Sequence, residues 1–227
     1  MIRCIVFDFD GTLVDSNAVK RDCFDRAIAG LGELRARKAL TAALRVGGDR
    51  YTIFGAVAQD LWKEPTAAAS EARKLATAYS RCCANGVRRA PPRRGFRSTF
   101  VVLRRRGIPL YVNSATPRAD LLPLLRARGM LGCFAGVHGT PGDKVQNLRA
   151  VMRTQRLRPH QIAMIGDGAD DLAAARAARC RFVAIAPSAS LAGNTMPALP
   201  DLRRLRPLLQ QRFGLRRSVS NSTRDLV

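Results

Sequence analysis

The segment Asp8-Phe9-Asp10-Gly11-Thr12-Leu13-Val14-Asp15-Ser16 directly follows the apolar run Cys4-Ile5-Val6-Phe7, and this junction indicates both fold and chemistry. The apolar run is typical of a buried strand. Because side chains alternate along a strand, Asp8 and Asp10 project from one face and Phe9 from the other. Two carboxylates at a strand's carboxyl end repel each other unless a cation lies between them or one is protonated. We therefore expect a metal and acid–base site here.

Length and composition favour a globular protein. The chain has 227 residues, 47% of them hydrophobic, which is enough for one large domain or a core with a smaller insert. No apolar run approaches the roughly 18 residues needed to span a membrane. The N-terminal apolar residues run straight into the aspartates and do not resemble a signal peptide, so we expect a cytoplasmic protein.

The net charge of +22 comes from 39 basic and 17 acidic residues. A solvated surface, a nucleic-acid-binding surface and a general attraction of anionic substrates are all compatible with it. The arginines occur along the whole chain, and aromatic residues that stack on bases make up only 6%. We therefore favour the solvated surface and do not expect nucleic acid as a partner.

Six cysteines are scattered through the chain without the paired spacing of a metal site. The adjacent pair Cys82-Cys83 is compatible with a redox role. The favoured interpretation is that these are unpaired helix residues in a reducing compartment.

Short apolar runs alternate with helical segments beyond residue 95. Strands are predicted at 108–112, 162–165 and 182–185, with a short strand-like run at 133–138. Helices are predicted at 96–106, 145–156, 171–178 and from Thr116 to about 128, where Thr116-Pro117 fits the N-cap and first helical position. This alternation predicts an α/β fold: a Rossmann-like parallel sheet with helices on both faces.

A second, smaller unit is predicted between the first strand and this alternating region. Residues 16–88 have a helical pattern and lack strand-like runs, so we expect an inserted all-helical domain. The core would then comprise residues 1–15 and 89–227. Residues 86–95, rich in proline and arginine, are predicted to be a linker, and the polar end from about residue 214 to be frayed.

Further reactive side chains follow the later strands. Ser114 follows the strand at 108–112, Asp167 follows the strand at 162–165, and Lys144 follows a Gly-Thr-Pro-Gly-Asp loop. Ligands of open α/β sheets bind at the carboxyl ends of the strands, where these residues would meet. Carboxylates, a hydroxyl and a fixed cation suit a phosphoryl group, whose transfer depends on positioning and charge neutralisation.

In this order, the motifs resemble those of the haloacid dehalogenase superfamily of phosphohydrolases over nearly the whole chain. They are the aspartate segment at 8–16, Ser114, Lys144 and Gly166-Asp167-Gly168-Ala169-Asp170-Asp171. The helical insert resembles the C1 cap of the phosphoglycolate phosphatase and β-phosphoglucomutase branch.

The resemblance implies a role for each motif residue. Asp8 would be the nucleophile and form an aspartyl-phosphate. Asp10 would protonate the leaving oxygen and then deprotonate the attacking water. The side chains of Asp8 and Asp167, with the backbone carbonyl of Asp10, would hold Mg²⁺. Ser114 would bind a phosphoryl oxygen, and Lys144 would offset negative charge.

Supporting and cap residues follow from the same resemblance. Asp171 or Asp170 would support Lys144 or the metal. Gly47-Gly48-Asp49-Arg50 is similar to a Gly-x-x-Arg substrate loop, so Arg50 is a candidate substrate-binding residue; a turn with a solvated arginine is the alternative. Lys20 stands where the mutase branch has histidine, which weakens the mutase interpretation, and it is a second candidate for the cleft.

Two departures from the family pattern affect local geometry only. Val145 replaces a frequent proline, and Arg179 replaces a favoured glycine, at a cost of roughly 1 kcal/mol if its φ is positive.

The resemblance implies a Mg²⁺-dependent phosphatase of a small-molecule phosphate ester, such as phosphoglycolate or a sugar phosphate. Family dehalogenases lack the second aspartate, so Asp10 argues against dehalogenation. A β-phosphoglucomutase-like mutase and a basic nucleic-acid-binding protein on the same scaffold remain alternatives. We expect a monomer or a weak dimer.

Overall fold

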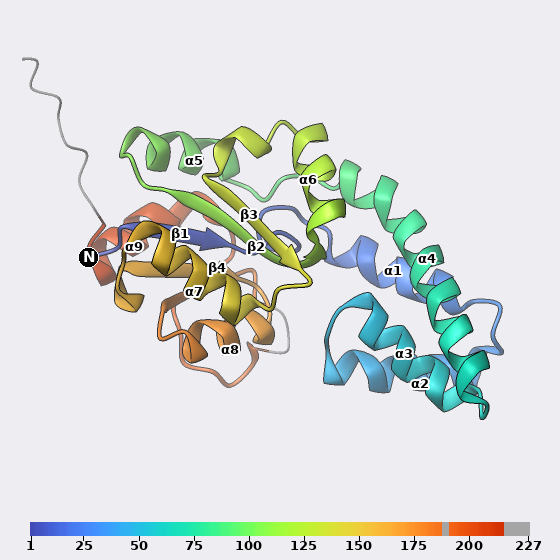
Figure 1. The fold of residues 1–227 in the computed structure, drawn as a ribbon. Coiled ribbons are helices and arrows are strands. Elements are labelled where there is room, and N and C mark those ends of the chain that lie inside the picture. Colours follow the sequence, from blue (N-terminus) through green and yellow to red (C-terminus); the bar gives the residue numbers. More distant parts are fainter. Residues whose placement is uncertain (188–190, 216–227) are drawn as a thin grey trace, which may run out of the picture.

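A parallel β-sheet forms the centre of the larger part of the molecule (Figure 1). The computed structural model describes residues 1–187 and 191–215, and within them the sheet has six strands in the order β3-β2-β1-β4-β5-β6. The strands are β1 (Cys4–Phe7), β2 (Leu110–Pro117), β3 (Gly136–Thr140), β4 (Ile162–Gly166), β5 (Arg181–Ile185) and β6 (Ala198–Leu199). The structure confirms the predicted α/β, Rossmann-like architecture.

Helices cover both faces of the sheet, and the alternation of β1 shows why. Ile5 and Phe7 belong to one apolar cluster, together with α5 (Phe96–Arg105), α6 (Arg118–Ala127) and α9 (Leu205–Phe213). Cys4 and Val6 point to the other face, into a cluster with α7 (Lys144–Gln155) and α8 (Ala169–Ala177). A strand that is apolar at every position is therefore buried on both sides, as parallel sheets require.

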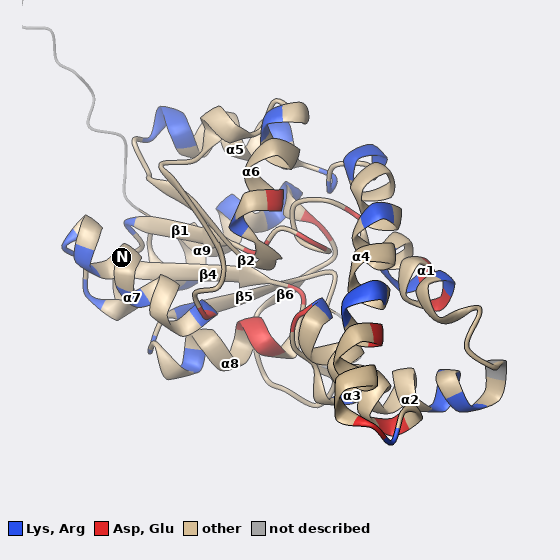
Figure 2. Cartoon of the chain, turned by 45° about the vertical axis from the view of Figure 1, so that its right-hand side comes forward, with Lys and Arg blue, Asp and Glu red and all other residues tan. Residues whose placement is uncertain are grey.

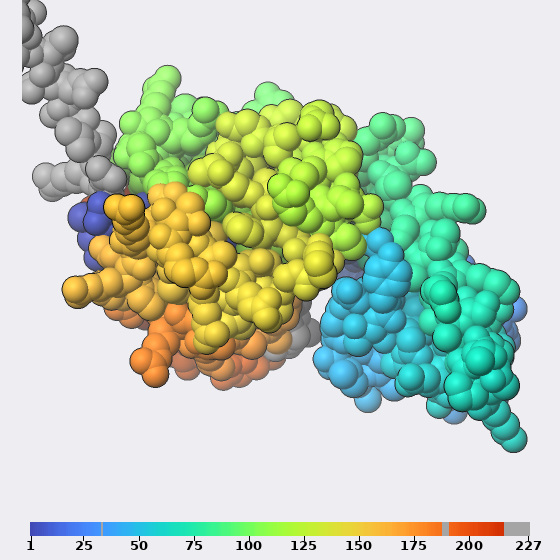
Figure 3. All heavy atoms as spheres, viewed as in Figure 1, coloured from blue at the N-terminus to red at the C-terminus, as the bar shows by residue number. Residues whose placement is uncertain are grey.

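Four helices follow β1 and form a separate mass in contact with the sheet part (Figures 1 and 3). They are α1 (Asn17–Ile28), α2 (Glu33–Val46), α3 (Arg50–Leu61) and α4 (Pro65–Arg89), and we call residues 17–89 the helical unit. It has its own apolar cluster, in which the Phe24 ring lies 5.4 Å from that of Phe54 and 4.3 Å from that of Tyr79.

A disulfide joins Cys23 of α1 to Cys82 of α4, with their Cα atoms 5.6 Å apart. Cys82 is a helix residue, as predicted, but its bond to Cys23 was not predicted. Helices α1 and α4 pack side by side, so positions 59 apart in sequence meet. Cys83, the neighbour suggested as a redox partner for Cys82, is a free thiol.

Several predicted boundaries are wrong by a few residues. The linker predicted at 86–95 is helical as far as Arg89, where α4 ends just before Pro91-Pro92. The second strand does not end at Asn113-Ser114 but continues to Pro117. Thr116 is therefore in a strand and caps no helix; α6 begins only at Arg118.

The structure has further elements without a clear sequence signal. These are β6, α9 and three short 3₁₀ helices, at Leu131–Cys133, Pro159–Gln161 and Leu202–Arg204. Leu215 is buried and bridges to Ile2, so the frayed end predicted from residue 214 is wrong for this residue. Residues 216–227 lie outside the described part. No helix within that part is both long and apolar enough to cross a membrane.

Candidate active site

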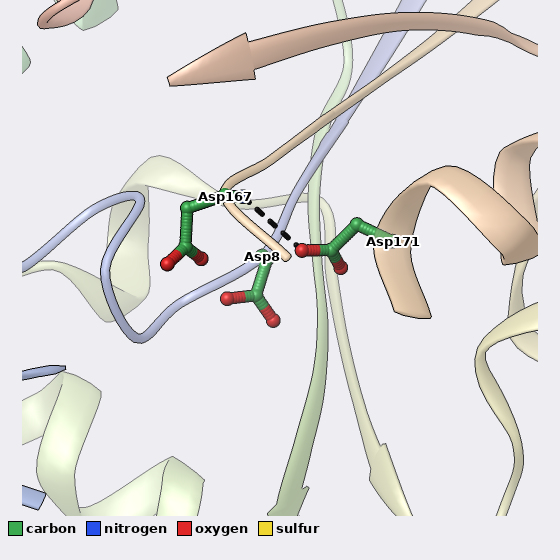
Figure 4. A group of neighbouring side chains, drawn as sticks. All are labelled: Asp8, Asp167 and Asp171. Atoms are coloured by element: carbon green, nitrogen blue, oxygen red, sulfur yellow. Dashed lines mark hydrogen bonds between the residues drawn. The ribbon is translucent and has the colours of Figure 1, made fainter. Parts of the chain in front are cut away.

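Three buried carboxylates converge at the carboxyl edge of the sheet (Figure 4). Asp8 follows β1, Asp167 follows β4, and Asp171 lies in the first turn of α8. Oxygen atoms from the three side chains all lie within 4.8 Å of one another. Figure 2 shows acidic segments at this edge, whereas basic residues are spread over the outer helices. Such a cluster is stable only with compensating positive charge.

Two glycines allow the carboxylates to approach the backbone. Gly11 has a φ of +77°, and a Cβ there would lie 2.2 Å from Oδ2 of Asp167. At Gly166, a Cβ would lie 2.3 Å from Cγ of Asp171. Any larger residue at either position would displace a carboxylate of the cluster.

Lys144 supplies the positive charge from the start of α7. Its Nζ lies 3.0 Å from Oδ1 of Asp8, 2.5 Å from Oδ1 of Asp171 and 2.7 Å from Oδ2 of Asp170. Asp143 caps this helix by accepting from the Gln146 N–H at 2.7 Å, which fixes the first turn and thereby Lys144. Although burial opposes its charge, Asp171, Asp8 and Asp170 raise the pKa of Lys144 well above its ordinary value.

Asp8 carries the least favourable charge of the cluster. Burial raises its pKa well above the ordinary value, and Asp171 and Asp167 add to this shift while Lys144 opposes it. One ammonium is therefore not enough to balance the buried carboxylates. Positive charge placed beside Asp8 would favour its ionised form.

Asp171 is held by backbone groups as well as by Lys144. Its Oδ2 accepts from the N–H groups of Asp167 and Gly168, at 3.2 and 3.1 Å. Burial, partly opposed by Lys144, raises the pKa of Asp171 to about 6. Asp170, in contrast, has a side chain that is 63% exposed. Lys144 therefore pairs with a buried carboxylate, that of Asp171, and with an exposed one, that of Asp170.

Asp10 precedes the helical unit and has different contacts from the three clustered carboxylates. Lys20 forms an ion pair with Oδ2, which also accepts from Thr116 Oγ1 at 3.1 Å, and Ser16 Oγ donates to Oδ1 at 2.7 Å. Burial alone would raise the pKa of Asp10, but Lys20 and the two hydroxyls outweigh it and lower the pKa. Thr116, predicted as a helix cap, contacts this carboxylate instead.

Asp167 is oriented by one residue of the segment 8–16 and by the residue that directly follows this segment. Thr12 Oγ1 donates to its Oδ1 at 3.3 Å, and Asn17 Nδ2 donates to its Oδ2 at 2.7 Å. Asn17 is the first residue of α1, so the helical unit contacts the carboxylate cluster directly.

Ser114 is buried on β2, and its Oγ accepts from the Thr116 N–H at 3.1 Å. The adjacent Asn113 donates to the Lys144 carbonyl at 2.9 Å and accepts from Asn147 at 3.0 Å. This link ties β2 to the start of α7. The structure thereby brings Asp8, Lys144, Asp167 and Asp171 together, with Asp10 and Ser114 at the same sheet edge.

The donor set fits a hard divalent cation. Asp171 accepts from Lys144 and from two backbone N–H groups. Asp8 accepts from Lys144 through Oδ1, and Asp167 accepts from the neutral side chains of Thr12 and Asn17, so these two carboxylates are the candidate ligands. Mg²⁺ prefers oxygen ligands and is often held by one or two carboxylates.

A cavity of about 530 Å³ opens between this edge and the helical unit. Asp10, Lys20 and Arg50 line it, together with apolar side chains that include Phe24 and Ile53. Arg50 is not a freely solvated turn residue: its side chain is 14% exposed and its Nη2 lies 2.9 Å from Oδ2 of Asp120 on α6. Both candidate residues of the helical unit, Lys20 and Arg50, therefore border the same cavity.

Sequence analysis did not identify several residues that orient the carboxylates. Ser16 and Thr12 belong to the first motif, and hydroxyl side chains so close to the aspartates could have been predicted to donate hydrogen bonds to carboxylates. The remaining residues, Asn17, Asn113, Thr116 and Asn147, carry no comparable local signal, because their contacts depend on how separate elements pack.

Comparison with known proteins identifies one family. The model of haloacid dehalogenase-like hydrolases matches residues 2–179. A phosphoglycolate phosphatase of Photorhabdus laumondii is 29% identical over 192 residues, which cover 81% of this chain and 80% of the relative. One of Escherichia coli strain K12 is 28% identical over 212 residues, with 81% of each protein covered.

Solved structures show the same fold. A protein of Haemophilus somnus, described as a predicted phosphoglycolate phosphatase, has a TM-score of 0.74 at 18% identity and covers 92% of this chain and 98% of its own. CbbY of Rhodobacter sphaeroides, solved with phosphate, has a TM-score of 0.67 at 21% identity. The match covers 90% of this chain and 96% of CbbY. A 2-haloacid dehalogenase of Pseudomonas syringae has a TM-score of 0.59 at 17% identity and covers 93% and 99%, so the fold alone does not select the reaction.

Proposed function

The chain belongs to the haloacid dehalogenase-like hydrolase family, and on this basis we propose that it is a Mg²⁺-dependent phosphatase of a small phosphorylated metabolite. One observation carries the proposal: Lys144 bridges Asp8 and Asp171 while Asp10, two residues from Asp8, borders the cavity. The curated relatives are phosphoglycolate phosphatases, which supports a phosphate monoester as the substrate.

We propose that the side chains of Asp8 and Asp167 and the backbone carbonyl of Asp10 hold the Mg²⁺ ion. When bound, the ion would neutralise negative charge on the carboxylates and on the phosphoryl group. The raised pKa of Asp8, caused mainly by burial, supports the need for such a cation.

The proposed reaction has two displacement steps at phosphorus. Asp8 forms a bond from a carboxylate oxygen to phosphorus as the bond to the leaving oxygen breaks, giving an aspartyl-phosphate. Asp10 gives a proton to the leaving oxygen and then removes a proton from the water that attacks this intermediate. As the water oxygen bonds to phosphorus, the bond between phosphorus and Asp8 breaks, which releases phosphate and restores the carboxylate. Lys20, Ser16 and Thr116 stabilise the carboxylate form of Asp10, which is the form that accepts the proton from water.

Lys144 and Ser114 would act on the phosphoryl oxygens. Lys144, 3.0 Å from the proposed nucleophile, offsets the charge that gathers around phosphorus. The Ser114 hydroxyl is fixed by the Thr116 N–H and retains its own proton for donation to a phosphoryl oxygen.

We propose that the helical unit is a cap that selects the substrate. The cavity between it and the sheet has room for a small metabolite and offers Lys20 and Arg50 to a second anionic or hydroxyl group. Arg50, paired with Asp120, is placed to exchange this partner for a substrate carboxylate or phosphate. Phosphoglycolate and sugar phosphates both have such a group.

The test is phosphate release from p-nitrophenyl phosphate with Mg²⁺ by the intact chain and by Asp8→Asn. Loss of the nucleophile should lower turnover by roughly a thousandfold or more. The matched control is Asp15→Asn, the same change at an exposed residue of the same segment, which should keep its activity. Full activity of Asp8→Asn would contradict the proposal.

A phosphate-release screen with phosphoglycolate and several sugar phosphates would then identify the substrate. Conversion of a sugar 1-phosphate to its 6-phosphate without release of phosphate would show a mutase and contradict the phosphatase assignment.

A further inference from the structure

A second cavity, of about 920 Å³, lies outside the carboxylate cluster. It is formed by the end of α4, the segment 90–92, α5, and the end of α6 with the turn that follows. None of the predicted site residues lines it, and it shares only Arg88 and Ala127 with the cavity beside Asp10. Figure 2 shows basic segments on these helices along one side of the molecule.

Six arginines and no acidic residues line this cavity. Five of them, Arg88, Arg89, Arg97, Arg104 and Arg105, make no side-chain hydrogen bond or ion pair within the described residues. These side chains are exposed, and guanidinium groups gathered around one concave surface raise the local attraction for anions. The planar guanidinium also matches phosphate by paired hydrogen bonds, which makes arginine a preferred phosphate ligand.

The sixth arginine fixes the wall of the cavity. Arg128 Nη1 donates to the carbonyls of Val87 and Arg88 at 2.9 and 2.6 Å, and its Nη2 donates to that of Ala90 at 2.6 Å. These bonds attach the end of α4 to the end of α6. The Arg128 Nε is buried without an acceptor, so a donor remains unsatisfied in the cavity wall.

The floor of the cavity is apolar. Its exposed part comes from Val101, which is 49% exposed, and from Pro91 and Pro92, while Phe96, Phe100 and Met130 lie buried beneath it. Inorganic phosphate alone would leave this surface in contact with water. A ligand with both several negative charges and an apolar ring would cover the arginines and the floor together.

We propose that this cavity binds a small phosphorylated molecule with two or more phosphate groups and an apolar ring, the chemistry of a nucleoside di- or triphosphate. The phosphates would lie among the arginines of α4 and α5, and the ring against the apolar floor. This site is separate from the proposed phosphatase centre, and its occupancy does not depend on the reaction there.

The experiment is calorimetric titration of the full chain with the non-hydrolysable adenosine 5′-(β,γ-imido)triphosphate at physiological salt. The test variant is Arg97→Glu/Arg104→Glu, which reverses two unpaired charges of the cavity. Because this variant removes two guanidinium partners of the phosphates and adds two negative charges, affinity should fall at least about tenfold. The control, Arg149→Glu/Arg153→Glu on the opposite face, makes the same charge change outside the cavity and should alter affinity by less than about threefold. Circular dichroism verifies that both variants are folded.

Four results would contradict the proposal. Equal loss of affinity in the two variants would show attraction by net charge only. Retention of affinity in the test variant would place the nucleotide elsewhere, without affecting the phosphatase proposal. Tighter binding of a single-stranded oligonucleotide, weakened by the same test variant, would make this face a nucleic-acid surface. Tripolyphosphate, which lacks the ring, should bind at least about tenfold more weakly; equal binding would refute the role of the apolar floor.

Discussion

Arg50 Nη2 lies 2.9 Å from Asp120 Oδ2, and this ion pair joins α3 of the helical unit to α6 beside the sheet. Arg50 is largely buried at the cavity, whereas the Asp120 side chain is 53% exposed. Both residues line the cavity, and Arg50 is the one whose charge would attract an anionic substrate. Two variants separate substrate binding from the attachment of the helical unit.

Arg50→Ala should raise KM for phosphoglycolate roughly tenfold to a hundredfold, because a charge-assisted hydrogen bond of about 1.5–3 kcal/mol is lost. Asp120→Ala also breaks the ion pair but leaves Arg50 available, so KM should change by less than about threefold. Steady-state kinetics of both variants measure the difference. Equal effects would mean that Arg50 only fastens the helical unit.

Lys144→Ala should destabilise the protein, because the buried carboxylates of Asp8 and Asp171 lose their ammonium partner. Removal of one partner from a buried ion pair costs about 3–5 kcal/mol. Thermal unfolding should show the loss, and added Mg²⁺ should restore part of it by supplying positive charge. An unchanged Tm in Lys144→Ala would contradict this account of the cluster.

Removal of divalent metal should abolish phosphatase activity and lower Tm. At a hundred times its dissociation constant, Mg²⁺ should stabilise the native state by about 2.7 kcal/mol. Asp167→Asn should remove most of this shift, while the exposed Asp15→Asn should retain it. Scanning fluorimetry after EDTA treatment and Mg²⁺ addition provides the measurement, and identical shifts in both variants would place the ion elsewhere.

Cys82→Ser should lower stability under non-reducing conditions, because the disulfide to Cys23 closes a loop over a sequence separation of 59. For a loop of this size, constraint of the unfolded chain is worth up to about 4 kcal/mol. With reductant present, the wild type and the variant should have the same Tm. Cys83→Ser, at the neighbouring free thiol, serves as the control. A wild-type Tm that is the same with and without reductant would contradict the expectation.

Arg179→Gly should stabilise the protein. Arg179 has a φ of 56°, as anticipated for a position where the family favours glycine. Glycine adopts this conformation without the steric cost, so a gain of about 1 kcal/mol is expected. Arg176→Gly, the same change within α8, should instead destabilise by about 1 kcal/mol. Urea unfolding of both variants tests the opposite signs.

The sheet and the carboxylate cluster were predictable because their signals are local. An apolar run followed by two alternating aspartates specifies both a buried strand and the edge where it ends. Asp167 and Lys144 follow the same logic at β4 and α7. Once the strands were predicted to be parallel, their carboxyl ends had to meet, and the residues there had to lie close together.

Features that depend on packing between elements were not predictable in this way. Thr116 has the sequence of a helix cap, yet β2 continues through it because the strand pairs with β3. Cys23 and Cys82 meet only because α1 packs against α4. The two-residue strand β6 is too short for any periodicity. The ion pair between Lys20 and Asp10 likewise depends on the angle at which α1 leaves the first motif.

The disulfide has a mechanical consequence for the helical unit. Cys23 and Cys82 lie in α1 and α4, the two helices through which the chain enters and leaves this unit. The cross-link therefore joins the two connections to each other but not to the sheet. The bond thus resists a change in the spacing of α1 and α4, while contacts such as those of Arg128 with Val87, Arg88 and Ala90 hold the end of α4 to α6.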